Sequence, residues 1–135
     1  MSINEHVPPE DQHAGRTSFD GEVERLRVRM IDGDVSLLAR HADYVSAVGA
    51  GEAAILTADG QTRYAACIGG MLAMIQNEAN LIATTFEWAD QIDLDRAKRA
   101  KEVAEARIAA ANDDKELLLA QAKLQRALVR IGVKH

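Results

Sequence analysis

The chain has 135 residues, of which 47% are hydrophobic, a net charge of −5 and one cysteine, Cys67. This length allows one hydrophobic core of ordinary domain size with a small appendage. The apolar runs are too short to cross a bilayer, and no basic segment followed by an apolar one opens the chain as a signal peptide would. A single cysteine excludes an internal disulfide framework and is typical of a reducing compartment.

Charge is divided unevenly along the chain. Residues 1–92 carry 6 basic and 14 acidic side chains, a net charge of −8, whereas residues 93–135 carry 10 basic and 7 acidic ones, a net charge of +3. A basic segment on an acidic body indicates an acidic protein surface or a polyanionic ligand as its partner. The alternative is that these Lys and Arg side chains only cover a solvated helix face.

The first ninety residues have two different compositions. Residues 1–17 are polar, so we expect a lead-in that is mobile or supplies only a short edge strand. Residues 18–90 contain short runs rich in Val, Ile and Leu, separated by Gly and Asp at intervals of roughly ten residues. The predicted strands cover residues 23–30, 35–38, 45–48, 52–56, 63–68, 71–75 and 79–84. Such spacing predicts an antiparallel β-sandwich or barrel rather than a parallel sheet with crossover helices.

Three local signals shape the predicted strands. The alternation of apolar and charged residues over 23–30 slips at Arg25, which predicts a β-bulge. Asp59-Gly60 lies between two of the runs and predicts a hairpin loop. Gly69-Gly70 permits a bend where two further runs meet.

Residues 91–135 are rich in Ala, Glu, Lys and Arg and contain no Pro. They predict two helices, Asp93 to about Ala111 and Lys115 to Ile131, which a short polar turn makes antiparallel neighbours. The residues expected in their contact are Ala97, Ala100, Ala104, Ile108 and Ala111 on the first helix and Leu117, Ala120, Leu124, Ala127, Leu128 and Ile131 on the second. Small residues facing Leu let the two axes approach closely.

Asp93 stands where an N-cap belongs, ahead of Asp95 in the first turn. An Ala-rich contact buries little apolar area, worth about 25 cal/mol per Å², so the hairpin is predicted to be marginally stable unless it is docked. The predicted fold class is therefore α+β, an N-terminal antiparallel β-sandwich (18–90) followed by a C-terminal antiparallel two-helix hairpin (91–135).

No catalytic or metal site emerges from the sequence. His41 and Cys67 could form a thiol–imidazole pair, but Cys67 lies in an apolar strand pattern that predicts a buried, inert thiol. The remaining histidines show no metal-ligand spacing. Phe86 and Trp88, just before the helices, could pin the base of the hairpin or simply pack at the domain boundary.

Several short motifs, taken in order, resemble the epsilon subunit of F-type ATP synthase, the central-stalk subunit of the bacterial and chloroplast enzymes. They are Ser18-Phe19-Asp20-Gly21-Glu22-Val23-Glu24, Gly33-Asp34-Val35, Leu37-Leu38, His41-Ala42, Gly69-Gly70-Met71-Leu72, Ile92-Asp93-x-x-Arg96-Ala97 and Arg126-Ala127-Leu128-x-Arg130-Ile131. Each motif is weak alone, but their order and spacing over residues 18–135 make the combined signal specific.

The resemblance implies a non-catalytic rotor subunit. In that family a ten-stranded β-sandwich sits against the gamma subunit and the c subunits of the membrane ring. The hairpin can fold down on the sandwich or extend into the alpha/beta catalytic head, where it restrains ATP hydrolysis. The implied location is the cytoplasmic face of a bacterial membrane, reached only through the complex, with no nucleic-acid partner. The alternative is a free-standing ATP-binding regulatory module that no longer assembles with the synthase.

Some members of this family bind ATP as a regulatory ligand, and the resemblance implies no required cofactor. The resemblance places the ATP-binding positions at Glu87, Ile92, Asp93, Arg96, Ala97, Arg126 and Arg130. Guanidinium groups suit phosphate because they stay charged and form two parallel hydrogen bonds. Val103 stands where ATP-binding members tend to carry a further Arg. The competing interpretation is that Asp93 only caps its helix and that the late arginines only favour a helix C-terminus.

The hairpin cations form a second candidate site. In the family, the extended hairpin meets an acidic segment of the beta subunits, and Lys and Arg facing carboxylates would give screened attraction. The candidate contact residues are Lys98, Arg99, Lys101, Lys115 and Lys123, together with the two late arginines Arg126 and Arg130.

Overall fold

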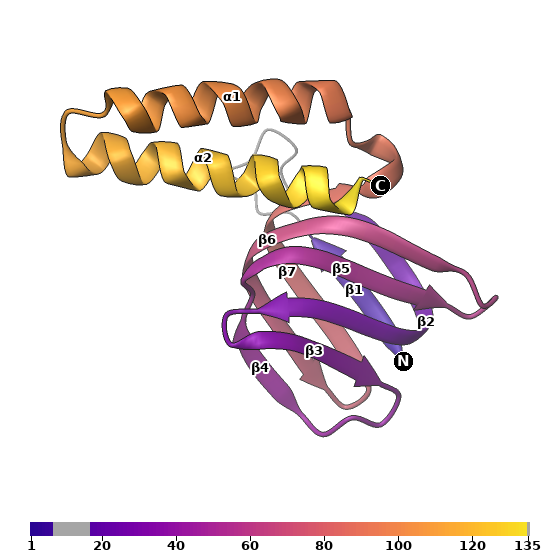
Figure 1. Cartoon of the computed structure of the whole chain (residues 1–135). Helices are drawn as coiled ribbons and strands as arrows, with labels where there is room; N and C mark the ends of the chain where they lie inside the picture. The colour runs from indigo at the N-terminus through magenta and orange to yellow at the C-terminus, as the bar shows by residue number, and fades with distance from the viewer. Residues whose placement is uncertain (7–16, 135) are drawn as a thin grey trace.

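The computed structural model describes residues 1–6 and 17–134 (Figure 1). The described elements are β1 (Ser2–His6), β2 (Thr17–Met30), β3 (Gly33–Leu38), β4 (Tyr44–Ala47), β5 (Ala50–Thr57), β6 (Thr62–Ile75), β7 (Glu78–Trp88), the 3₁₀ turn η1 (Ala89–Gln91), α1 (Leu94–Ala110) and α2 (Asp114–Val133). The predicted fold class, a β-sandwich followed by a helical hairpin, is confirmed. Most of the lead-in, residues 7–16, lies outside the described residues; its first part supplies β1.

Two layers are built from one continuous hydrogen-bonded sheet with the strand order β1-β7-β6-β5-β2-β3, in which β4 also pairs with β6 and β1 with β2. The first half of β2 pairs with β1 and its second half with β3. Likewise β6 pairs first with β5 and then with β4. Because these long strands serve both layers, the described chain has seven strands where the resemblance implies ten. One pair departs from the antiparallel pattern. β1 lies between β2 and β7, and it runs antiparallel to β2 but parallel to β7.

Local features predicted from the sequence produce the bends that let strands change layers. The register of β2 against β5 shifts between Val23 and Arg25, which is the predicted bulge. In β6, Gly69 and Gly70 have φ values of 71° and 109°, which disfavour residues with a side chain. A Cβ on Gly70 would lie 1.8 Å from the carbonyl oxygen of Ile82 on β7. The predicted Gly-Gly bend is therefore also a close approach of two strands.

The core lies between the layers and is almost entirely apolar. Its largest fully buried aliphatic and Met side chains are Ile3, Leu26, Met30, Leu37, Ile55, Leu72, Met74 and Leu81. Trp88 closes the core at the end of β7, where its ring meets Phe86 and Phe19 edge-on at centroid distances of 5.0 and 6.1 Å. Trp88 is thus part of the core as well as the last residue before the hairpin.

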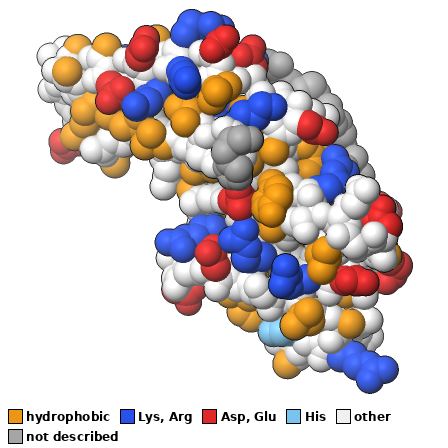
Figure 2. Space-filling view, turned by 45° about the vertical axis from the view of Figure 1, so that its right-hand side comes forward, with side chains coloured by type: hydrophobic (Ala, Val, Ile, Leu, Met, Phe, Trp, Pro, Cys, Tyr) orange, Lys and Arg blue, Asp and Glu red, His pale blue; other side chains and the backbone are white. Residues whose placement is uncertain are grey.

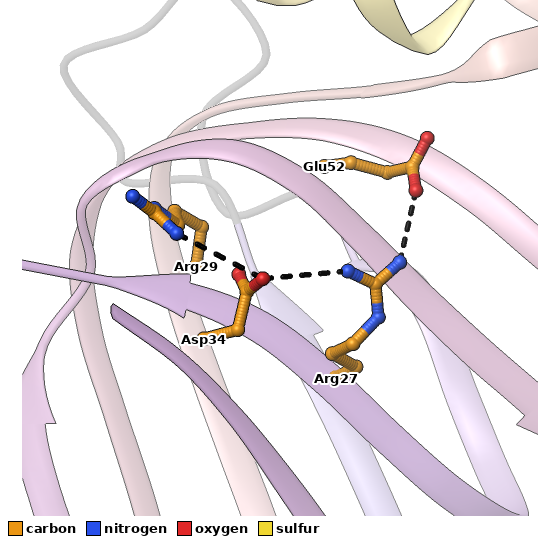
Figure 3. Close-up of polar contacts among 4 residues, drawn as sticks. All are labelled: Arg27, Arg29, Asp34 and Glu52. Carbon is orange, nitrogen blue, oxygen red and sulfur yellow. Dashed lines mark hydrogen bonds and ion pairs between the residues drawn. The ribbon is translucent and has the colours of Figure 1, made fainter.

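A charged network covers the outer face of β2, β3 and β5 (Figure 3). Arg27 lies between two carboxylates, 2.9 Å from Glu52 and 3.7 Å from Asp34, and Arg29 lies 3.8 Å from the same Asp34 oxygen. Partly exposed pairs of this kind contribute about 0–1 kcal/mol each. With two arginines and two carboxylates, the network has no net charge.

The hairpin lies across one end of the sandwich and projects beyond it (Figure 1). Four alanines, Ala97 and Ala104 on α1 and Ala120 and Ala127 on α2, are buried between the helices. Two members of the predicted stripe, Ala100 and Leu128, are exposed, Leu128 by 47%. The prediction was wrong there because close Ala–Ala packing makes the contact narrow, so residues a quarter turn from the seam stay in solvent.

The main contacts between the hairpin and the β-strands are those of α2 with β5 and β6. The docking patch consists of the buried side chains of Ala66, Ile92 and Val133, with Ala89 and Val129 beside them. Two polar contacts reinforce it: Arg130 Nε donates to Glu87 Oε1 at 2.9 Å, and Lys134 Nζ donates to the carbonyl oxygen of Ala89 at 2.9 Å. This is a small attachment for a hairpin of two long helices.

Candidate functional site: a groove along the helical hairpin

One face of the hairpin carries a groove, here called the seam groove, that follows the line between α1 and α2 from the sandwich to the hairpin turn. It consists of three adjoining hollows of about 200, 330 and 270 Å³, called basal, middle and tip. The basal and middle hollows share Ala100, Ala127 and Arg130, and the middle and tip hollows share Lys123. Alanines along the seam leave this space because their side chains do not fill the cleft between the helices.

Five of the predicted ATP-binding residues line the basal hollow. They are Glu87, Asp93, Arg96, Ala97 and Arg130. Arg126 lines the middle hollow beside Arg130. The side chain of Ile92 is instead buried in the docking patch against Ala66 and Val133. The structure therefore gathers six of the seven predicted side chains along one groove and places the seventh beneath the hairpin.

Acids and cations are balanced at the base of the groove. Glu87 is paired with Arg130, and Asp93 Oδ1 accepts a hydrogen bond from the backbone N–H of Arg96 at 3.0 Å, which confirms the predicted N-cap. Glu87 and Arg130 are each about one-third exposed, with 33% and 30% of their side-chain surface accessible. Both can therefore exchange their mutual contact for a ligand.

The upper groove is more basic than its base. Its charged lining is Arg126, Lys123, Arg107 and the single acid Glu116. Arg107 was missed by the sequence interpretation. Its spacing from Arg96 could have indicated it. Arg107 follows Arg96 by eleven residues, about three helical turns, so both side chains lie on the same face of α1.

The candidate contacts to beta subunits do not gather on one face. Lys123 lines the groove, whereas Lys98, Arg99, Lys101 and Lys115 line none of its hollows. Figure 2 shows Lys and Arg side chains on the hairpin interspersed with acidic and hydrophobic ones. Contact of these residues with an acidic partner stays a prediction.

Cys67 is buried in β6, and burial, together with the negative charge of Glu5, raises the pKa of its thiol to about 12. A thiol that keeps its proton at neutral pH is a poor nucleophile. His41 lies in the β3–β4 loop, where Nδ1 donates to the carbonyl oxygen of Ala42 at 2.7 Å. Nothing in this geometry supports a thiol–imidazole pair.

The Cys67 pKa predicts a specific alkaline instability. The unfolded thiol ionises near pH 9, whereas the folded thiol stays protonated up to about pH 12. Below pH 9 both states are protonated and stability is unaffected; above it the unfolding free energy should fall by about 1.4 kcal/mol per pH unit. Urea unfolding of the wild type and of Cys67→Ala at pH 8 and pH 11 measures this. A wild type that loses no more stability than the variant over this range would contradict the prediction.

An apolar face covers the outer side of the layer formed by β4, β7 and the second half of β6. Four large side chains, Val45, Met71, Ile75 and Ile82, are 45–60% exposed there. The register places Met71 opposite Ile82 on one side and Ala47 on the other, with Val45 opposite Ala73. We call this the apolar sheet face. A contiguous exposed patch of this kind marks an interaction surface.

Two loops meet at the end of the sandwich away from the hairpin (Figure 1). The N–H of Arg40 donates to Asn77 Oδ1 at 2.8 Å, and the N–H of Gln76 donates to Asp43 Oδ1 at 3.0 Å. These hydrogen bonds hold the β3–β4 loop against the β6–β7 turn. The end of the molecule therefore presents a cross-linked polar surface, here called the end loops.

Among residues 1–6 and 17–134, no helix combines the length and hydropathy needed to cross a membrane. In the same residues, no three His, Cys, Asp or Glu side chains gather closely enough to hold a metal ion. The seam groove, the apolar sheet face and the end loops are the surfaces that the fold presents for binding.

Structural comparison finds the same fold in two mitochondrial ATP synthases. A chain in the cryo-EM structure from Euglena gracilis superimposes with a TM-score of 0.81, over 99% of this chain and 82% of that chain, at 17% identity. A chain in the central stalk and c-ring structure from Tetrahymena thermophila gives a TM-score of 0.64, over 100% of this chain and 96% of that chain, at 11% identity. At such identities the likeness concerns the fold alone.

Sequence comparison identifies the family. Residues 13–89 match the model of the ATP synthase delta/epsilon chain β-sandwich domain, and residues 90–134 match that of its long α-helix domain. The ATP synthase epsilon chains of Caldicellulosiruptor bescii and Bacillus velezensis are 37% and 36% identical, over 86% and 85% of this chain and 84% and 86% of those chains. The sodium ion specific epsilon chain of Propionigenium modestum is 31% identical over 85% of this chain and 83% of its own length. The chain therefore belongs to the ATP synthase delta/epsilon chain family, with both of its domains present.

Proposed function

We propose that this chain is a non-catalytic central-stalk subunit of an F-type ATP synthase. It helps couple ion translocation to ATP synthesis and restrains ATP hydrolysis through its hairpin. Family membership supports the assignment to the complex. The observation that carries the regulatory role is the small docking patch, in which three buried side chains and two polar contacts attach the hairpin. Detaching it exposes little apolar area, so a modest partner contact can offset the cost.

Each surface fits one part of such a complex. The apolar sheet face is the proposed seat of the gamma subunit, because a rotor contact needs a permanent apolar interface. The polar end loops, at the end away from the hairpin, are the proposed contact with the c subunits of the membrane ring. The hairpin cations are the proposed contact with acidic segments of the alpha/beta head. The chain would then be peripheral, at the cytoplasmic face of a bacterial membrane through the complex.

Titration into the cognate alpha, beta and gamma head complex tests this role. The full chain is expected to inhibit ATP hydrolysis saturably, and a chain ending at Ile92 is expected to bind without inhibiting, because it keeps the apolar sheet face and lacks the hairpin. The ATPase rate and co-sedimentation with the head complex are measured together. A cooperative thermal transition of the truncated chain is the control for folding, because removal of α2 uncovers Ala66.

The outcomes separate this role from the alternatives. Absence of binding by the full chain would contradict the central-stalk assignment and favour a free-standing nucleotide-binding module. Equal inhibition by the full and truncated chains would contradict the regulatory role of the hairpin while leaving the assembly role in place.

A second proposal is that the basal and middle hollows of the seam groove bind ATP when the hairpin is docked. Arg96, Arg126 and Arg130 line these hollows together with the small side chains of Ala97, Ala100 and Ala127, and Val103 lines the middle hollow. Guanidinium groups would hold the phosphates, and Glu87 and Asp93 at the base offer carboxylates to hydrogen-bond donors of the base or sugar. Because the groove exists only when both helices are paired, bound ATP would stabilise the docked form.

Calorimetric titration of the isolated chain with ATP tests this site. Arg126→Gln is expected to lower the affinity about tenfold, because it removes one charge-assisted contact worth about 1.4 kcal/mol. It is a cleaner variant than a change at Arg130, which would also break the pair with Glu87. Lys98→Gln removes the same charge outside the groove and should leave the affinity unchanged. Equal losses in both variants, or no saturable heat with the wild type, would contradict the site without bearing on assembly.

A further inference from the structure

We propose that the seam groove takes linear polyphosphate chains longer than the triphosphate of ATP, with the tip hollow as the additional binding site. The inference rests on the proposed ATP site only in so far as the same groove holds the first phosphates. It assigns a ligand class to the tip hollow, which ATP in the basal and middle hollows would leave empty.

The first observation is a row of cations along the whole groove. From base to tip the lining includes Arg96, Arg130, Arg126, Lys123 and Arg107. Among the described residues, only Arg130 of these five has a carboxylate within 4.0 Å, that of Glu87. The other four carry charge that no side chain in this part of the chain neutralises at contact distance, which is unlike the self-neutralised network on β2, β3 and β5.

The second observation is that cations outnumber acids along the groove. Its lining has five cations and the three acids Glu87, Asp93 and Glu116, while the acidic residues Asp95, Glu102 and Glu105 of α1 line none of the three hollows. Glu116, the one acid at the tip, accepts a hydrogen bond through Oε2 from the backbone N–H of Asn112 at 3.0 Å. A surplus of positive charge along a groove raises the local potential and favours a polyanion.

The length of the groove selects the length of the ligand. Arg96 and Arg107 are eleven residues apart on α1, which places them about 16 Å apart along the helix axis. A triphosphate at the base has three phosphates to offer and is held by the cations of the basal and middle hollows. A longer chain continues between Lys123 and Arg107, because the middle and tip hollows adjoin; Ala110, Leu119 and Ala120 line the continuation.

Charge density favours polyphosphate over an acidic peptide for this groove. Each phosphate of a linear chain carries a charge, whereas an extended peptide places successive side chains of one face about 6.6 Å apart and must order each one. Cations on two helices that face one cleft match the closely spaced charges of the inorganic chain. The acidic peptide is therefore the competing ligand in the test.

The test is calorimetric titration of the full chain with inorganic tripolyphosphate, with a long linear polyphosphate of defined length, and with a poly-glutamate peptide of matched charge. The long polyphosphate is expected to bind about tenfold more tightly per molecule than tripolyphosphate, because a further charge-assisted contact forms at Arg107, which lines the tip hollow and neither of the other two. The variant Arg107→Gln should lose this gain and keep its tripolyphosphate affinity within about twofold. The matched control Lys98→Gln removes the same charge outside the groove and should keep the gain.

Three outcomes would overturn the inference: equal affinity of the wild type for short and long polyphosphate, equal loss of the gain in Arg107→Gln and in the control variant, or tighter binding of poly-glutamate through Arg107. ATP titration of the wild type distinguishes the two proposals. ATP binding by the wild type without a chain-length gain refutes the tip site alone, and absence of ATP binding by the wild type refutes the basal site. Inhibition of the head complex by the full chain is a separate readout of the central-stalk role.

Discussion

Gly70→Ala is expected to destabilise the sandwich by about 3 kcal/mol or more, because a Cβ at Gly70 would make the closest contact among the described glycines. Two costs add at this position. Gly70 has a φ of 109°, where a residue with a side chain is strained. The new Cβ would also meet the carbonyl oxygen of Ile82 at 1.8 Å, so β6 and β7 would have to separate where they pair.

The matched control for this prediction is Gly60→Ala in the β5–β6 loop. Gly60 also has a positive φ of 86°, but a Cβ there would have no neighbour within 4 Å. Its cost should therefore be only the backbone strain, about 1 kcal/mol. Urea unfolding of both variants and the wild type measures the difference. Equal unfolding free energies for the two variants would show that the close approach of β6 and β7 is not what requires a glycine.

The double substitution Met71→Glu, Ile82→Glu is expected to weaken binding of the gamma subunit by about a hundredfold or more. The two side chains lie opposite each other on neighbouring strands and are 45% and 46% exposed in the free chain. In the proposed interface both are buried, so two carboxylates would lose their hydration without gaining partners. Sedimentation or calorimetry with purified gamma subunit measures the affinity.

The control for the apolar sheet face is Leu38→Glu. It replaces a leucine side chain on β3 that is 57% exposed by a carboxylate. Leu38 lies opposite Arg25 on the other layer, away from the apolar sheet face. This variant should keep its affinity for gamma and a thermal midpoint close to that of the wild type, because Leu38 is exposed. The double variant should melt cooperatively at a somewhat lower midpoint, because its two carboxylates lie opposite each other. Loss of binding in Leu38→Glu alone would move the proposed interface to the other layer.

Features set by neighbouring residues were predicted well from the sequence. Asp93 caps α1, the bulge lies at Val23–Arg25, and Gly69-Gly70 bends β6, because each depends on the conformational preferences of a few adjacent residues. The helical hairpin also followed from local composition and a polar turn, although its helices are slightly displaced, with α2 running from Asp114 to Val133. Periodicity in one helix does not reveal how wide its contact with another will be, which is why Leu128 was wrongly placed in the seam.

For the candidate site, too, the sequence indicated which residues to consider, and the tertiary structure showed where they lie. Seven candidate ATP-binding residues could be named from the family resemblance, but only the packed helices show that six line one groove and that Ile92 belongs to the docking patch. Arg107 joins the groove through its position on the helix surface, and none of the motifs includes it. Of the cations proposed to contact the beta subunits, only Lys123 and the two late arginines line the groove.

The sequence by itself determined most of the segments that become strands and helices, where two of the long strands bend, and the surplus of positive charge on the hairpin, because these depend on local propensity and composition. The tertiary structure decided how two long strands serve both layers, why β1 runs parallel to β7, and which charges face one cleft. These features depend on contacts between residues far apart in the chain, such as Glu87 with Arg130 and Ala66 with Val133. Their free energy arises only when the whole chain has folded and brings both partners together.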